Sequence, residues 1–190
     1  MQKSKLNLIK CLKEMLLEYP DVVTAFEKKD PRAKDKLLKW IRQAETVMSS
    51  YNISEVSELA GLRSKIISPR FTEHKRSSAR KIQTQVAASV LYDIQHIVIS
   101  ALKPHEDRAE ECRDVIRQLL QIISQNGTVQ YRNEVLFEHF VLQVWQLIKT
   151  NEQLRPGAAK LKALLPDTDI HLLIAEEINP ADFIPATHQA

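Results

Sequence analysis

The sequence predicts an all-α protein, and two observations lead to this fold class. Only three glycines occur in 190 residues, whereas sheets joined by tight hairpins need glycine repeatedly, because those turns require a positive φ. Apolar residues recur at helical spacing along most of the chain. We therefore expect a helical bundle in a single domain spanning residues 1–179, followed by an irregular tail at 180–190.

The first part of the chain, residues 4–70, predicts short and basic helices that pack against the rest of the bundle. We expect Pro20 to end the first helix, because proline interrupts the backbone hydrogen bonds. Asp30 and Pro31 form a helix start: Asp30 can accept bonds from free amides, and Pro31 has no N–H to leave unpaired. Gly61 is expected to end a helix that Ser54 begins. The predicted helices span residues 4–18, 21–29, 31–51 and 54–61.

Three long helices are predicted at the centre of the bundle. Pro104 is expected to separate the first two, and Asn126-Gly127 is a typical helix stop after the second. The third is apolar over more than half of its circumference, so it should contact several neighbours. Two short helices within residues 158–178 follow. The three central helices are expected at about residues 77–102, 105–125 and 132–151.

Cysteine usage and hydropathy indicate a cytoplasmic location. The two cysteines, Cys11 and Cys112, both fall in helical apolar patterns, and two thiols are too few for a disulfide framework in a chain of this length. The longest apolar stretch, residues 86–102, is interrupted by polar side chains at 93, 95 and 96, so we expect no membrane contact. The start of the chain does not resemble a signal peptide.

Charge is divided unevenly along the chain. Residues 1–81 contain 18 Lys and Arg against 10 Asp and Glu, whereas residues 82–190 contain 9 against 14. The excess peaks between residues 63 and 81, where one acid, Glu73, faces seven cations. These are Arg63, Lys65, Arg70, Lys75, Arg76, Arg80 and Lys81. Such a stretch predicts binding to nucleic acid or to an acidic protein surface. The alternatives are a solvated basic face, or neutralisation by the acids of helix 105–125.

Residues 56–68 contain a spaced set of apolar, small and glycine positions. These positions are Val56, Ser57, Gly61, Leu62 and Ile67. The pattern resembles the helix-turn-helix of DNA-binding repressors. The resemblance implies that Arg63, Ser64 and Lys65 would point toward base edges and phosphates. Pro69 and Arg70 depart from the pattern, and the alternative is the short helix that ends at Gly61.

An arginine and a histidine, Arg132 and His139, lie seven positions apart. On a helix, seven residues at about 100° each bring the two side chains to nearly the same face. The spacing resembles the Arg-x4–6-His signature of HEPN-type ribonucleases, which are all-α and usually dimeric. The resemblance implies that Arg132 would hold the scissile phosphate and His139 would transfer a proton, with Asn133 beside them. The other interpretation is an exposed polar pair.

Other catalytic signatures are missing from the sequence. There is no Glu-x-x-His motif for a di-iron bundle, no glycine-rich phosphate loop and no Gly-x-Ser-x-Gly. We therefore expect no metal and no cofactor, and Trp40 and Trp145 are expected in the core. The favoured interpretation is a non-catalytic binding or regulatory module. The HEPN-like ribonuclease is the alternative, and a structural protein that forms homodimers through apolar helix faces is the third.

Overall fold

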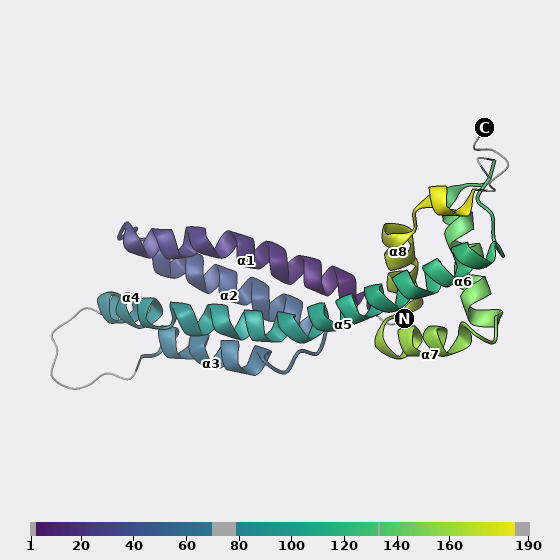
Figure 1. The fold of residues 1–190 in the computed structure, drawn as a ribbon. Helices are drawn as coiled ribbons and strands as arrows, with labels where there is room; N and C mark the ends of the chain where they lie inside the picture. Colours follow the sequence, from purple (N-terminus) through teal and green to yellow (C-terminus); the bar gives the residue numbers. More distant parts are fainter. Residues whose placement is uncertain (1–2, 70–78, 133, 185–190) are drawn as a thin grey trace. The chain divides into compact units, whose positions relative to one another are not determined.

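The computed structural model describes residues 3–69, 79–132 and 134–184. Within these ranges the chain forms eight α-helices and one 3₁₀ helix, with no strand, which confirms the predicted all-α class (Figure 1). Its internal contacts divide the chain into two compact units. We call Asn7–His105 the N-terminal unit, and Met1–Leu6 together with Glu106–Ala190 the C-terminal unit. The single domain stays a prediction, because contacts alone do not test whether the units fold independently.

The N-terminal unit is a set of helices that lie side by side (Figure 1). Helix α2 packs against α3 and α4, which also pack against each other. Near one end of α1 and α2, Asn7 Nδ2 donates to the Tyr51 hydroxyl over 3.1 Å, which fixes these helices as antiparallel. The elements are α1 (Lys5–Glu27), α2 (Ala33–Ser50), α3 (Val56–Ile67), α4 (Ala79–Ser89) and the first part of α5 (Leu91–Asn126).

Trp40 lies in the core of the N-terminal unit, as the sequence predicts. It is only 3% exposed, and its Nε1 donates to the Met15 carbonyl over 3.0 Å. The Tyr19 ring packs against it with 4.7 Å between ring centroids, and the Tyr19 hydroxyl donates to the Leu91 carbonyl over 2.6 Å. Burial raises the pKa of Tyr19 well above its ordinary value. These contacts fasten α1 to α2 and to the start of α5.

The C-terminal unit is built around α6, which packs against both α7 and α8. Trp145 of α6 is 2% exposed, so the second tryptophan is also in a core. Phe183 is 4% exposed and packs edge-on against Phe140 with 5.4 Å between ring centroids. The tail predicted to be irregular from residue 180 is therefore packed up to this ring. The elements are the rest of α5, α6 (Phe137–Thr150), α7 (Arg155–Leu164), α8 (Asp167–Glu177) and the 3₁₀ helix η1 (Pro180–Phe183).

Two predicted helix boundaries at prolines are wrong. Pro20 lies inside α1 and Pro104 lies inside α5. A proline in a helix removes one hydrogen bond to the carbonyl four residues earlier. Both prolines are exposed, so water can reach the backbone near them and satisfy the freed carbonyl. The predicted division into helices 77–102 and 105–125 is therefore wrong.

The break falls instead at Val90, between α4 and α5, which meet at an angle of 44°. Val90 N–H makes a long 3.4 Å bond to the Ala87 carbonyl, and regular bonding resumes where Ile94 N–H donates to the Val90 carbonyl over 3.0 Å. Among the described helices, none is by itself long and apolar enough to cross a membrane. The bent pair α4 and α5 meets that criterion by length and composition only.

Candidate polyanion-binding surface

Hydrogen bonds bring the starts of α2 and α4 and the end of α3 together at one end of the N-terminal unit. Arg80 Nη2 donates to the Pro31 carbonyl over 3.1 Å. Gln83 accepts from Lys34 Nζ over 2.9 Å and donates through Nε2 to the Ile67 carbonyl over 2.7 Å. The turn from α1 to α2 is thus held beside the first turn of α4.

Cations from three separate parts of the sequence meet at this end. The six cations listed below are all exposed. Two of them, Lys28 and Lys29, directly follow the last residue of α1, where the helix dipole favours positive charge. Lys29 has a φ of 54°, the left-handed conformation that closes many helices. We call this set the basic end: Lys28, Lys29, Arg32, Lys65, Arg80 and Lys81.

Two acids near the basic end, Asp30 and Asp35, are already engaged locally. Asp30 accepts from the Arg32 amide over 2.8 Å and pairs with Lys36 over 2.9 Å. These two hydrogen bonds, the amide bond first, lower the pKa of Asp30, so the carboxylate stays charged and occupied. Asp35 lies 3.8 Å from Lys34. Helix α2 begins at Ala33 with Arg32 as its N-cap and with no side-chain cap bond, so the predicted capping by Asp30 is wrong and the predicted start is two residues early. The Asp30 carbonyl accepts from the Ala33 amide in the turn before the helix.

The structure separates the residues predicted from the basic stretch. Arg63 is held in an ion pair with Glu45 of α2, with 2.8 Å between Nε and Oε1, and lies outside the basic end. Lys65, Arg80 and Lys81 are exposed members of the basic end. The remaining three predicted cations lie outside the described residues: Arg70, Lys75 and Arg76.

Sequence reasoning missed Lys28, Lys29 and Arg32, which are about 50 positions from Arg80. The usable signal was the Asp30-Pro31 helix start. It implies a tight reversal between α1 and α2, and a reversal places its charges at one end of a bundle. The partner helix at that end could not be read from the sequence, because the contact from Arg80 goes to a backbone carbonyl, that of Pro31.

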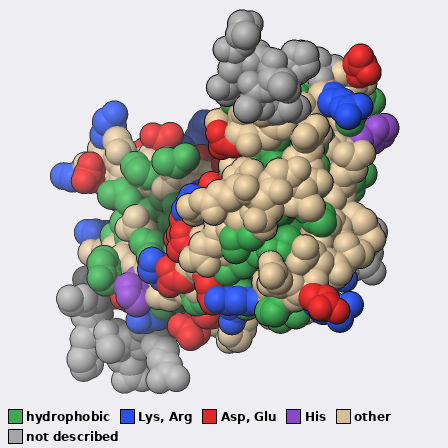
Figure 2. Space-filling view, turned by 45° about the vertical axis from the view of Figure 1, so that its right-hand side comes forward, with side chains coloured by type: hydrophobic (Ala, Val, Ile, Leu, Met, Phe, Trp, Pro, Cys, Tyr) green, Lys and Arg blue, Asp and Glu red, His purple; other side chains and the backbone are tan. Residues whose placement is uncertain are grey.

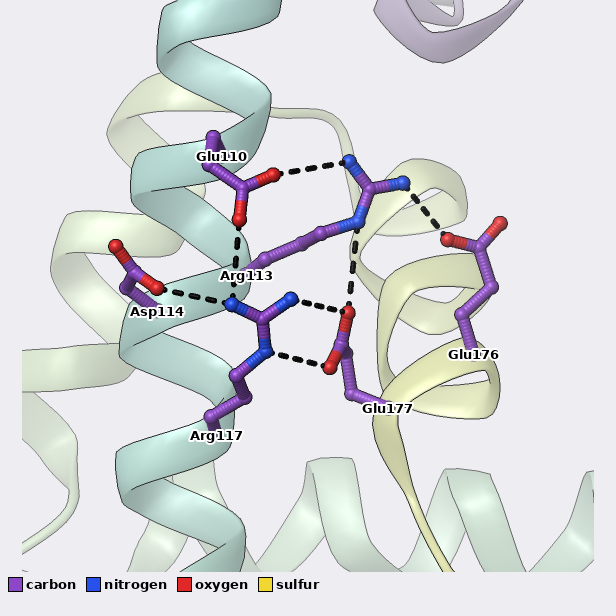
Figure 3. A network of polar contacts seen from close by, with 6 residues as sticks. All are labelled: Glu110, Arg113, Asp114, Arg117, Glu176 and Glu177. Atoms are coloured by element: carbon purple, nitrogen blue, oxygen red, sulfur yellow. Dashed lines mark hydrogen bonds and ion pairs between the residues drawn. The ribbon is translucent and has the colours of Figure 1, made fainter.

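Three acids of the segment predicted as helix 105–125, Glu110, Glu111 and Asp114, have basic partners inside the C-terminal unit. Lys160 Nζ lies 2.7 Å from Glu111. Figure 3 shows Arg113 and Arg117 of α5 reaching carboxylates of their own helix and of α8. Arg117 holds Glu177 with two bonds, of 2.7 and 3.1 Å, and hydrogen bonding to Glu177 raises the pKa of Arg117. The network comprises Glu110, Arg113, Asp114, Arg117, Glu176 and Glu177.

The two units differ from each other in net charge. By sequence, the N-terminal unit contains 17 Lys and Arg against 11 Asp and Glu, and the C-terminal unit contains 10 against 13. Figure 2 shows a face of the molecule on which basic and acidic side chains are interspersed. Interspersed charges cancel at a distance, so an excess of one sign, as at the basic end, marks a site for a charged partner.

The helix-turn-helix interpretation is wrong, and so is the alternative of a helix ending at Gly61. Gly61 lies in the middle of α3, which continues to Ile67 without a turn. A Cβ added at Gly61 would meet nothing within 4 Å, so this glycine serves neither a turn nor a close approach. The helix ends at Ile67, and its C-cap, Ser68, directly precedes Pro69.

The geometry expected for a HEPN-type site is also wrong. Helix α6 begins at Phe137, so Arg132 precedes it and does not share a helix face with His139. Arg132 lines an open groove of about 540 Å³ together with Gln143, and His139 is not among the lining residues. Asn133 lies outside the described residues. Within the described ranges, no group of three or more His, Cys, Asp or Glu side chains could hold a metal ion.

No protein-family model, curated protein or solved structure significantly matches this chain.

Proposed function

We propose that this protein is a non-catalytic binding module whose basic end contacts the phosphate backbone of a nucleic acid. The carrying observation is the convergence of the α1–α2 turn and the start of α4, through the 3.1 Å contact between Arg80 and the Pro31 carbonyl. It adds Lys28, Lys29 and Arg32 to the cations that the sequence alone suggested.

The distribution of charge favours phosphates as ligands. Arrays of Lys and Arg bind a phosphate backbone largely by displacing condensed counterions, and the logarithm of affinity falls by about 0.9 per contact for each logarithmic unit of salt. If four of the six cations contact duplex phosphates, the expected slope is about −3.6. An acidic protein surface lacks a condensed counterion layer and should give a shallower, screening-type dependence.

The test uses two variants with equal changes in charge. R80E/K81E reverses two exposed cations of the basic end, and R155E/K162E reverses two exposed cations of α7 in the C-terminal unit. Fluorescence anisotropy with labelled 20-nucleotide single strands and 20-base-pair duplexes gives the affinities. We expect R80E/K81E to weaken binding by at least about 10-fold at low salt, since it removes two contacts and adds repulsion. R155E/K162E should stay within about twofold of wild type.

Two results would overturn the proposal. One is an equal loss of affinity in both variants, which would indicate a response to net charge alone. The other is an absence of binding by wild type to every nucleic acid at 20 mM salt. Binding to polyglutamate instead, lost in R80E/K81E, would identify an acidic protein as the partner.

A further inference from the structure

A groove of about 530 Å³ runs between α1 and α2 in the N-terminal unit. Its walls come from one face of each helix, and Met15 and Val47 supply its apolar floor. The lining residues are Cys11, Glu14, Met15 and Glu18 from α1, and Lys39, Arg42, Gln43, Thr46 and Val47 from α2. The α1 wall is therefore acidic and the α2 wall is basic.

These opposite charges do not neutralise each other across the groove. Glu18, Lys39 and Arg42 make no ion pair with any residue in the described part of the chain, and all three are exposed. Glu14 has only a 4.0 Å contact to Lys10 of its own helix, which is at the limit of an ion pair and worth little. An acidic row on α1 and a basic row on α2 thus line the same groove without pairing with each other.

The two rows are also in register along the helix axes. Trp40 donates to the Met15 carbonyl and packs on Tyr19, so residue 40 is level with residues 15–19. Because α1 and α2 are antiparallel, each step back along α2 matches one step forward along α1. Lys39 therefore lies near the level of Glu18, and Arg42 near that of Glu14.

We propose that a second copy of this chain docks on the groove, related by a two-fold axis parallel to α1 and α2. Such a rotation exchanges the two walls and preserves the level of every residue. Glu18 then faces Lys39 of the second copy and Glu14 faces Arg42 of the second copy, and symmetry repeats both pairs. A two-fold axis across the helices would place carboxylates on carboxylates, which costs free energy.

The parallel two-fold axis would also favour nucleic-acid binding, an inference that rests on the proposed function of the basic end. Because levels are preserved, the basic ends of both copies lie at the same end of the dimer. One phosphate backbone could then contact both, and two linked sites bind more tightly than either one alone. The groove is small and its walls carry charged side chains that stay partly hydrated, so the expected dimer is weak, with a dissociation constant on the order of 10–100 µM.

Sedimentation velocity on the full chain, from 5 to 300 µM in 50 mM salt and without nucleic acid, tests the dimer. Wild type should shift from monomer toward dimer over this range. K39E/R42E makes both walls acidic and E14K/E18K makes both walls basic, so each variant alone should be monomeric throughout, with at least about 100-fold weaker association. An equimolar mixture should form a heterodimer, because every facing pair is again opposite in charge.

The control R155E/K162E should dimerise like wild type. A monomeric wild type at 300 µM would overturn the proposal, as would dimerisation that survives in either groove variant or a mixture that stays monomeric. Circular dichroism melts show whether the variants are folded. Nucleic-acid binding by R80E/K81E is measured separately, so failure of the dimer and failure of the basic end are distinguishable.

Discussion

Replacing Asp169 should destabilise the C-terminal unit more than any other single change to its polar groups. Asp169 is the one fully buried charged side chain among the described residues. Its Oδ2 accepts from the backbone amides of Lys5 and Leu6, over 2.6 and 3.2 Å. These amides open α1 and have no partner within that helix, so Asp169 supplies a cap from 164 positions away. The carboxylate also lies in the first turn of α8, whose dipole favours it.

The expected cost follows from these two bonds. A hydrogen bond to a charged group contributes about 1.5–3 kcal/mol, and both amides are partly buried. Asp169→Ala should therefore lower the free energy of unfolding by about 3–4 kcal/mol. Asp169→Asn keeps the shape and one carbonyl acceptor, so we expect about 1–2 kcal/mol. The control, Asp167→Ala, removes an exposed acid from the same helix turn and should cost about 0.3–1 kcal/mol.

The positions of the two tryptophans make the assay specific. The chain has two, with Trp40 in the N-terminal unit and Trp145 in the C-terminal unit. In a Trp40→Phe background, urea unfolding followed by tryptophan fluorescence reports the C-terminal unit alone. If Asp169→Ala costs no more than Asp167→Ala in this background, the long-range cap is not a stabilising contact.

Two further predictions concern pH and glycine. Burial lowers the pKa of His171 below its usual 6.5, while Asp167 raises it and Lys149 lowers it further. The neutral imidazole therefore contributes its full stabilisation above pH 6.5, the unfolded pKa. That stabilisation is lost as the pH falls through the lowered pKa of the folded state. Urea unfolding followed by Trp145 between pH 7.5 and 5 should show a smaller loss in His171→Gln than in wild type, and parallel losses would contradict this. Gly61→Ala should stabilise the N-terminal unit by about 0.5–1 kcal/mol, because the site is helical and open, whereas Gly127→Ala should destabilise the C-terminal unit because its φ is 59°. Thermal melts measure both changes. A destabilised Gly61→Ala would contradict the helical conformation of Gly61 and support a turn at this position.

The helical class could be predicted from the sequence because its signal is spread over the whole chain. Scarce glycine and recurring apolar spacing both reflect backbone requirements that no single contact can reverse. The boundaries of α2 (33–50) lie within two residues of the predicted 31–51, because Pro31 acts on the local backbone. Trp40 and Trp145 were placed correctly because large apolar rings are costly to expose.

The errors share a physical origin. The prediction assumed that Pro20 and Pro104 end helices. On an exposed helix face, however, a proline removes only one backbone hydrogen bond, and water can satisfy the freed carbonyl. The break at Val90 falls at a buried residue with no glycine or proline nearby, so neither residue type marks it in the sequence. Arg132 was assigned to a helix that begins only at Phe137, and its pairing with His139 depended entirely on that assignment.

The candidate surface was predicted only in part. Lys65, Arg80 and Lys81 are exposed and belong to it, whereas Arg63 is partly buried beside Glu45 and lies outside it. A charge run in the sequence shows how many cations are near each other along the chain, but the packing of the helices decides which of them share a surface. That packing is a tertiary property, and it also brings in the cations of the α1–α2 turn.

Mapping the bound nucleic acid on the protein is the sharpest test of the basic end as a phosphate-binding surface. Amide chemical shifts of ¹⁵N-labelled protein, followed during titration with a 20-base-pair duplex, locate the contact without any substitution. We expect the largest changes at residues 28–32, 65 and 79–81, reversed by added salt. Changes confined to α7 or α8, or shifts equally small along the whole chain, would contradict it.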